Sequence, residues 1–132
     1  MELTTFGAVL KFALEQEAAL AGLYAGAAAN AGPARDLLSE LAANGDRNRK
    51  RLEQIRRQQV NEMLLEAVQG LDTSDYRPGA GGEARAAVMV AEATLERFYL
   101  EAAGRLSLPE VVRSFGKLAD GHAQAQARLA RD

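Results

Sequence analysis

The sequence predicts an all-α protein, an antiparallel four-helix bundle that forms one domain over residues 1–132. Alanine, which has the highest helix propensity, occupies 27 of the 132 positions, and there are only seven aromatic residues. Four long segments carry apolar side chains at the three- and four-residue spacing of an amphipathic helix. No alternating run of β-branched residues competes with them, so a β-sandwich is not expected.

The first helix is predicted over residues 5–29. Thr4 or Thr5 can cap its first turn, and the run from Asn30 to Pro33 combines residues that end helices. Its inward-facing stripe consists of Leu3, Phe6, Leu10, Ala13, Glu17, Leu20 and Tyr24.

The second helix is predicted to begin at residue 33 or 34 and to continue to about residue 69, since proline is tolerated in a first turn. Its inward stripe consists of Leu38, Leu41, Gly45, Asn48, Leu52, Ile55 and Gln59. The same face continues beyond the length of the first helix through Val60, Met63, Leu64, Ala67 and Val68. This surplus apolar face must pack on the following loop or on another copy of the chain, so we expect a homodimer.

Residues 70–82 are rich in turn-forming types and predict a long loop. The third helix is predicted over about residues 83–106, and the fourth over residues 109–131, with Ser107 as its cap. Their inward stripes are Val88, Glu92, Leu95, Tyr99 and Ala102, and then Val111, Phe115, Leu118, His122, Ala125 and Leu129. Short turns make each of the first and third helices antiparallel to its successor, while the long loop allows a crossover.

The chain also repeats itself. Glu17 and Tyr24 are spaced like Glu92 and Tyr99, at an offset of 75 residues, and Pro33 and Pro109 follow at an offset of 76. We therefore predict two pseudo-repeated helical hairpins, over about residues 5–69 and 83–131, related by a pseudo-twofold axis.

The repeat places Glu17 and Glu92 at one level on facing helices, at positions where leucine is expected. A buried carboxylate is costly unless it is paired, protonated or bound to a metal. Three interpretations follow: the helix ends are partly wet at these positions, arginines reach in to pair the two carboxylates, or the carboxylates are ligands of a metal.

This layout resembles the ferritin-like superfamily, in particular its rubrerythrin-like branch. Residues 64–76 are also similar to the connection after the second helix in short members of that branch. The resemblance implies a Glu on the first and third helices, often with a Tyr seven residues later, and a Glu-x-x-His pair on the second and fourth helices. In that family these six side chains hold two irons.

The match is incomplete. Glu17 and Glu92 occupy the family's ligand positions on the first and third helices. The paired positions fall on Gly45 and Asn48 of the second helix and on His122 and Ala125 of the fourth. A standard di-iron centre cannot be built from the three good donors that remain.

The resemblance thus leaves Glu17, Glu92 and His122 as candidate metal ligands, with Tyr24, Tyr99 and Asn48 as neighbouring hydrogen-bonding groups. Two carboxylates and one imidazole suit a mononuclear iron or zinc site. The same side chains can instead satisfy one another with a few waters. We predict no cofactor and no catalytic residue; the alternative is one iron or another divalent metal.

The predicted function is a rubrerythrin/ferritin-like bundle that has lost most of its di-iron ligands and serves as a non-catalytic structural or interaction protein. The alternative is a metal-binding redox or metal-handling protein, which as an enzyme would be a rubrerythrin-like oxidoreductase. A third possibility is a binding module for a small apolar ligand in a cavity beside Gly45.

Charge and composition exclude several other classes. The chain has no cysteine, hence no disulfide or thiolate site, and 16 basic against 18 acidic residues give a net charge of −2. The basic residues at 47–57 wind around their helix and have acidic residues within pairing distance, which predicts a solvated face rather than a nucleic-acid site. No targeting segment and no membrane span is recognised. We expect a cytoplasmic protein; its sequence identifies no protein partner.

Overall fold

The computed structural model describes residues 1–29, 32–59, 61–77 and 83–131, without the side chains of residues 61 and 62. The prediction of an all-α protein is confirmed for these residues, because they contain helices and no strand, with only two isolated β-bridges. The long helices are α1 (Phe6–Ala29), α2 (Arg35–Gln58), α4 (Ala84–Ala103) and α5 (Pro109–Arg131), and the short elements are α3 (Asn61–Leu64) and the 3₁₀ turns Gly32–Ala34 and Thr73–Tyr76.

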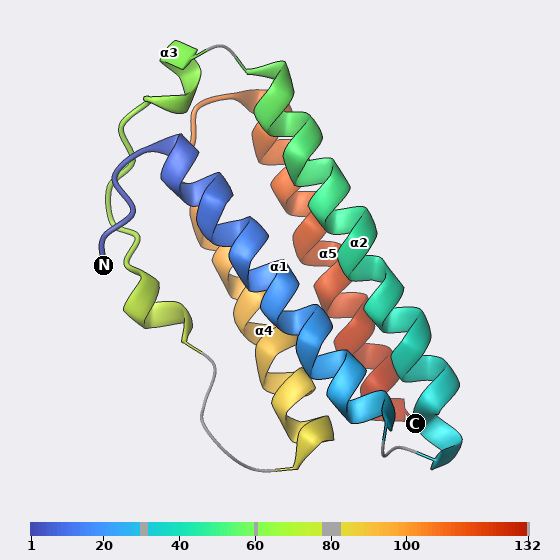
Figure 1. Ribbon diagram of the computed structural model, residues 1–132. Helices are drawn as coiled ribbons and strands as arrows, with labels where there is room; N and C mark the ends of the chain where they lie inside the picture. The colour runs from blue at the N-terminus through green and yellow to red at the C-terminus, as the bar shows by residue number, and fades with distance from the viewer. Residues whose placement is uncertain (30–31, 60, 78–82, 132) are drawn as a thin grey trace.

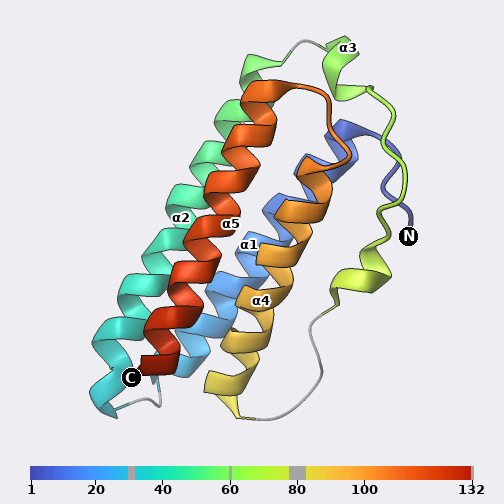
Figure 2. The ribbon, with the colours of Figure 1, turned by 180° about the vertical axis from the view of Figure 1, so that it is seen from behind.

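The four long helices lie side by side (Figure 1). The chain descends along α1, returns along α2, and then passes down the outside of the molecule before it ascends α4 and descends α5. α1 packs against α2 and α4, and α5 packs against α4, whereas α2 and α5 barely touch. Figure 2 shows these last two helices next to each other along one side of the molecule.

The predicted stripes form the core. Every stripe residue of α1, α4 and α5 is buried, including Glu17, Glu92 and His122. On α2 the apolar stripe residues and Gly45 are buried, while Asn48 and Gln59 are half-buried. The hydroxyl of Thr5 accepts a hydrogen bond from the backbone N–H of Ala8 at 3.1 Å, which confirms the predicted cap of the first helix.

The predicted extent of the second helix is wrong. α2 ends at Gln58, and the extended backbone of Gln59 leads the chain away from the helix axis. The following segment gains other backbone partners: Leu3 donates to the carbonyl of Leu71 at 2.8 Å, and Val68 donates to that of Thr4 at 2.9 Å. These contacts with the N-terminal residues bury Val68 and Leu71 and replace the hydrogen bonds of a longer helix.

Because α2 ends at Gln58, the apolar helical face on which the homodimer prediction was based does not continue as expected. Val68 is buried within its own chain, Leu65 is 72% exposed and Met63 is 37% exposed. Val60 lies outside the described residues. The homodimer stays a prediction, without the continuous helical face on which it was based.

The end of the third helix and the cap of the fourth also differ from expectation. α4 ends at Ala103, and the backbone N–H of Gly104, which follows it, donates to the carbonyl of Leu100 at 3.3 Å. Ser107 donates its hydroxyl to Glu66 instead of capping α5, which begins at Pro109 as predicted. Residues 78–82 of the predicted loop lie outside the described part of the chain. None of the helices in the described residues is long and apolar enough to cross a membrane.

Candidate functional site

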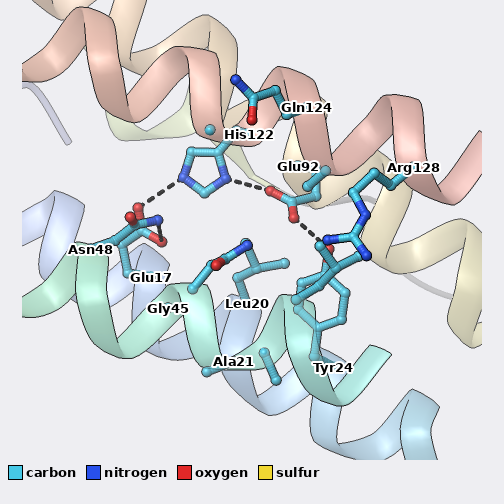
Figure 3. Close-up of a pocket in the computed structure, with 15 residues that line it drawn as sticks. Glu17, Leu20, Ala21, Tyr24, Gly45, Asn48, Glu92, His122, Gln124 and Arg128 are labelled. Carbon is cyan, nitrogen blue, oxygen red and sulfur yellow. Dashed lines mark hydrogen bonds and ion pairs between the residues drawn. The ribbon is translucent and has the colours of Figure 1, made fainter. Parts of the chain in front are cut away.

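The structure brings all six predicted site residues together in the middle of the bundle. Glu17 and Tyr24 come from α1, Asn48 from α2, Glu92 and Tyr99 from α4, and His122 from α5. Each lies on the inward stripe of its helix, which is why residues far apart in the sequence converge here. All of them except Tyr99 also line a pocket (Figure 3).

The tyrosines and glutamates are paired crosswise between α1 and α4. The hydroxyl of Tyr99 donates to Oε2 of Glu17 at 2.6 Å, and the hydroxyl of Tyr24 donates to Oε2 of Glu92. Because the two helices run in opposite directions, the seven-residue spacing on each sets every phenol opposite the other helix's carboxylate (Figure 1). This reciprocity is what the repeat predicts at these four positions.

The imidazole of His122 lies between the two carboxylates (Figure 3). Its Nε2 is 2.9 Å from Oε2 of Glu17, and its Nδ1 contacts Oε1 of Glu92. The ring also stacks on Tyr99, with ring centroids 5.7 Å apart and an interplanar angle of 9°. Both ring nitrogens face carboxylate oxygens, so a ring that donates to both carries two protons and a positive charge.

The environment shifts the pKa of the histidine accordingly. Burial alone lowers the pKa of His122, but the hydrogen bonds and negative charges of Glu17 and Glu92 outweigh it and raise that pKa to about 9. Burial, followed by the nearby carboxylate charges, raises the pKa of the Tyr24 and Tyr99 phenols. Both phenols therefore remain protonated and able to donate.

The cluster is internally satisfied. The side-chain amide of Asn48 donates to Oε1 of Glu17 at 3.3 Å, so all four carboxylate oxygens accept a hydrogen bond. No buried side-chain nitrogen or oxygen in the described residues lacks a partner.

A cavity of about 190 Å³ reaches this cluster from between α2 and α5. Small residues form much of its wall, namely Ala21, Ala42, Gly45, Gly121 and Ala125. Arg128 also lines it and is held by Glu40 of α2 through two hydrogen bonds of 2.9 and 3.0 Å. The cavity beside Gly45 proposed from the sequence therefore exists, although its inner end is polar.

The six side chains do not form a metal site as they are arranged. A metal requires several donor atoms that converge on one point at about 2.0–2.2 Å, whereas the two nitrogens of His122 point to different carboxylates. Gly45 and Ala125 offer no side-chain donor at the family's other ligand positions. No group of three or more His, Cys, Asp or Glu side chains within the described ranges is placed to hold a metal ion. Metal binding by Glu17, Glu92 and His122 stays a prediction.

Sequence reasoning missed the residues on the α5 side of the pocket. Gln124 and Arg128 line it one helical turn apart, and neither lies on the inward stripe of α5. Their i, i+4 spacing beside the stripe residue Ala125 is a signal that places them on one flank of the helix.

Comparison with known proteins identifies no relative: no protein-family model, no curated protein and no solved structure matches the chain.

Proposed function

We propose that this chain is a ferritin-like helical bundle without a resident metal, and that it serves as a structural or interaction protein rather than an oxidoreductase. One observation carries the proposal. The ring of His122 lies between Glu17 and Glu92, with a nitrogen on each carboxylate, and so supplies the positive charge that a metal would otherwise bring.

The course of the chain supports the ferritin-like part of the proposal. Two helical hairpins joined by a long connection that returns along the outside of the bundle are the arrangement expected of that superfamily (Figure 1). The crosswise pairs of Tyr24 with Glu92 and of Tyr99 with Glu17 add the internal symmetry of two related hairpins.

The chemistry of the cluster supports the metal-free part. Removing two carboxylates from water is expensive, and a buried cation with additional hydrogen bonds offsets that cost. His122 supplies the cation, while the two phenols and the amide of Asn48 supply the remaining donors. The polar layer is then a fixed element of the core that sets the register of the helices.

Metal handling is the competing candidate, because the cavity between α2 and α5 gives an ion a route to the same carboxylates. The ring of His122 would have to leave its place between Glu17 and Glu92 before their oxygens and its nitrogen could converge on one ion.

Elemental analysis and NMR of untagged protein, purified without chelator, separate the two candidates. His122 is the only histidine, so its ring nitrogens are assigned without ambiguity. We expect substoichiometric metal, even after ferrous iron is offered anaerobically, and two protonated ring nitrogens at pH 7. One tightly bound metal per chain, lost in Glu17→Ala and His122→Ala but kept in Gln124→Ala, would overturn the proposal and favour metal handling.

A further inference from the structure

The cavity between α2 and α5 has the size of a small-molecule site. Its volume of about 190 Å³ exceeds the roughly 150 Å³ of an engineered apolar cavity in another protein that binds benzene. α2 and α5 run next to each other but barely touch, which leaves this space between them (Figure 2). A cavity of this size admits a molecule of about one six-membered ring with a short substituent.

Small residues on both helices account for the space. Those that line the cavity from α2 and α5 are Ala42, Gly45, Gly121 and Ala125. A Cβ atom built on Gly121 meets no atom within 4 Å, and one built on Gly45 meets Ala21 at 3.6 Å, an ordinary contact. Packing against the neighbouring helices therefore does not require glycine at either position, and larger side chains on this face would reduce the cavity.

The wall that a ligand would touch is mainly apolar. Glu17 is fully buried and Glu92 is 2% exposed, and all four oxygens of these carboxylates already accept hydrogen bonds within the cluster. These two residues therefore offer no free acceptor to a ligand. The apolar part of the wall consists of Leu20, Ala21, Leu41, Ala42 and Ala125.

The cationic side chains of the lining are engaged as well. Arg128 donates two hydrogen bonds of 2.9 and 3.0 Å to Glu40 on α2, and the ring nitrogens of His122 both contact carboxylates. A charged ligand would lose its hydration here without gaining a partner of opposite charge, and an unpaired buried charge is costly. A neutral ligand avoids that cost and gains from the burial of apolar surface.

We propose that this cavity binds a small neutral molecule with an apolar body of about one ring. The ring lies against Leu20, Leu41 and Ala125, which line the space. The third interpretation of the sequence, a binding module for an apolar ligand, thereby gains a site of stated size and lining. The inference goes beyond the proposed function, because it gives the bundle a ligand.

Three probes of similar shape but different charge test the preference for a neutral ligand. Benzyl alcohol is neutral at pH 7, benzylamine is a cation and benzoate is an anion. We expect benzyl alcohol to bind at a single site with a Kd of about 1 mM or lower, and both charged probes to bind at least roughly tenfold more weakly. Calorimetry gives the affinities. Because His122 is the only histidine, shifts of its ring signals in NMR spectra place the neutral probe in this cavity.

Two neighbouring alanines of α2 test the location. Ala42 lines the cavity, whereas Ala43 is exposed and lies outside the lining. Ala42→Leu adds its side-chain atoms to the cavity, and Ala43→Leu adds the same atoms to the surface with the same change in helix propensity. We expect the affinity for benzyl alcohol to fall at least about tenfold in Ala42→Leu and to stay unchanged in Ala43→Leu. Circular dichroism shows whether both variants fold.

Gly121→Leu, which blocks the cavity from α5, replaces Ala42→Leu if that variant does not fold. Its control is Gly116→Leu, since Gly116 lies outside the lining and a Cβ built on either glycine meets no atom within 4 Å. Equal binding of the neutral and charged probes, equal affinity in the blocking variant and its control, or no saturable binding of benzyl alcohol would each overturn the inference. None of these results concerns the metal content, so the metal-free proposal would stand after any of them.

Discussion

The α1–α4 side and the α2–α5 side of the bundle contribute different sets of residues to the buried polar cluster. On the α1–α4 side the two hairpins make equivalent contributions: each provides one glutamate and one tyrosine at the same spacing, and each phenol donates to the other hairpin's carboxylate. On the α2–α5 side the corresponding positions differ. Gly45 of α2 corresponds to His122 of α5, and Asn48 corresponds to Ala125, at an offset of 77 residues.

The difference shows how one side chain can balance a symmetric pair of charges. In the described part of the chain, His122 of α5 forms the ion pairs with both Glu17 and Glu92. The empty position opposite, at Gly45, becomes part of the cavity. Symmetry on one side and asymmetry on the other thus produce both the closed charge network and the open space beside it.

Removing the histidine is expected to have the largest effect on this balance. His122→Leu leaves two carboxylates buried without a cation, and breaking a buried ion pair costs about 3–5 kcal/mol. Urea unfolding of His122→Leu and of the unmodified protein measures the loss. Gln124→Leu, an exposed substitution on the same helix, is the control and is expected to change stability by less than about 0.5 kcal/mol. Equal losses in the two variants would show that the ion pairs do not hold the bundle together.

The second prediction concerns pH. The pKa of His122 is raised in the folded state from 6.5 to about 9, so its contribution to stability is complete below pH 6.5 and is lost as the pH rises through 9. A shift of this size corresponds to a loss of about 3 kcal/mol. Unfolding free energies between pH 6 and 9.5 measure it. His122→Gln, which leaves no histidine, is expected to be nearly flat over that range, and a parallel decline in both proteins would assign the effect elsewhere.

Substitutions of the two tyrosines test whether the two hydrogen bonds between a phenol and a carboxylate contribute equally to the free energy of unfolding. A hydrogen bond to a charged group contributes about 1.5–3 kcal/mol. Tyr24→Phe is expected at the upper end of this range, because Tyr24 is the one donor to Oε2 of Glu92 in the described residues. Tyr99→Phe is expected at the lower end, because Oε2 of Glu17 also accepts from His122.

Thermal and urea unfolding of the two variants show which substitution lowers the free energy of unfolding more. Tyr76→Phe is the control, since its hydroxyl bonds to the half-exposed Glu101 at 2.6 Å outside the cluster. A larger loss in Tyr99→Phe than in Tyr24→Phe would contradict the expected inequality.

The smallest expected effect is a gain on the α2 side. Gly45→Ala places its Cβ at ordinary contact distances from Ala21 and from the Glu17 carbonyl, so the helix propensity of alanine is expected to add up to about 1 kcal/mol of stability. At Gly7 an added Cβ lies 3.1 Å from the backbone carbonyl of Leu64, which offsets that gain. Denaturant melts of both variants check the comparison, and a destabilised Gly45→Ala would indicate that the space at Gly45 is needed for folding.

Periodicity was sufficient to predict the core and the membership of the site. The stripes that contain Glu17, Glu92 and His122 are buried as expected, because helical spacing alone decides which side chains share a face. The boundary of the second helix was not predictable in this way. It depends on backbone pairing of residues 66–73 with the N-terminal residues. The paired residues are 60 to 72 positions apart in the sequence, a separation that local propensity does not register.

The arrangement of the side chains within the site could not be predicted from the sequence either. Spacing placed Glu17 and Glu92 at one level, but it carried no information on whether His122 would join them around a shared point or lie between them. Side-chain torsions and the competing hydrogen bonds of Tyr24, Tyr99 and Asn48 decide that, and they become visible only in three dimensions.

The hydrogen bonds between the tyrosines of one hairpin and the glutamates of the other also affect which hairpins can pair with each other. Two copies of the α1–α2 hairpin, taken from different molecules, could repeat the exchange of Tyr24 and Glu17 but would enclose two acids with no base between them. The α4–α5 hairpin alone brings His122. A lone imidazole on one half therefore favours the pairing of an α1–α2 hairpin with an α4–α5 hairpin over the pairing of two α1–α2 hairpins.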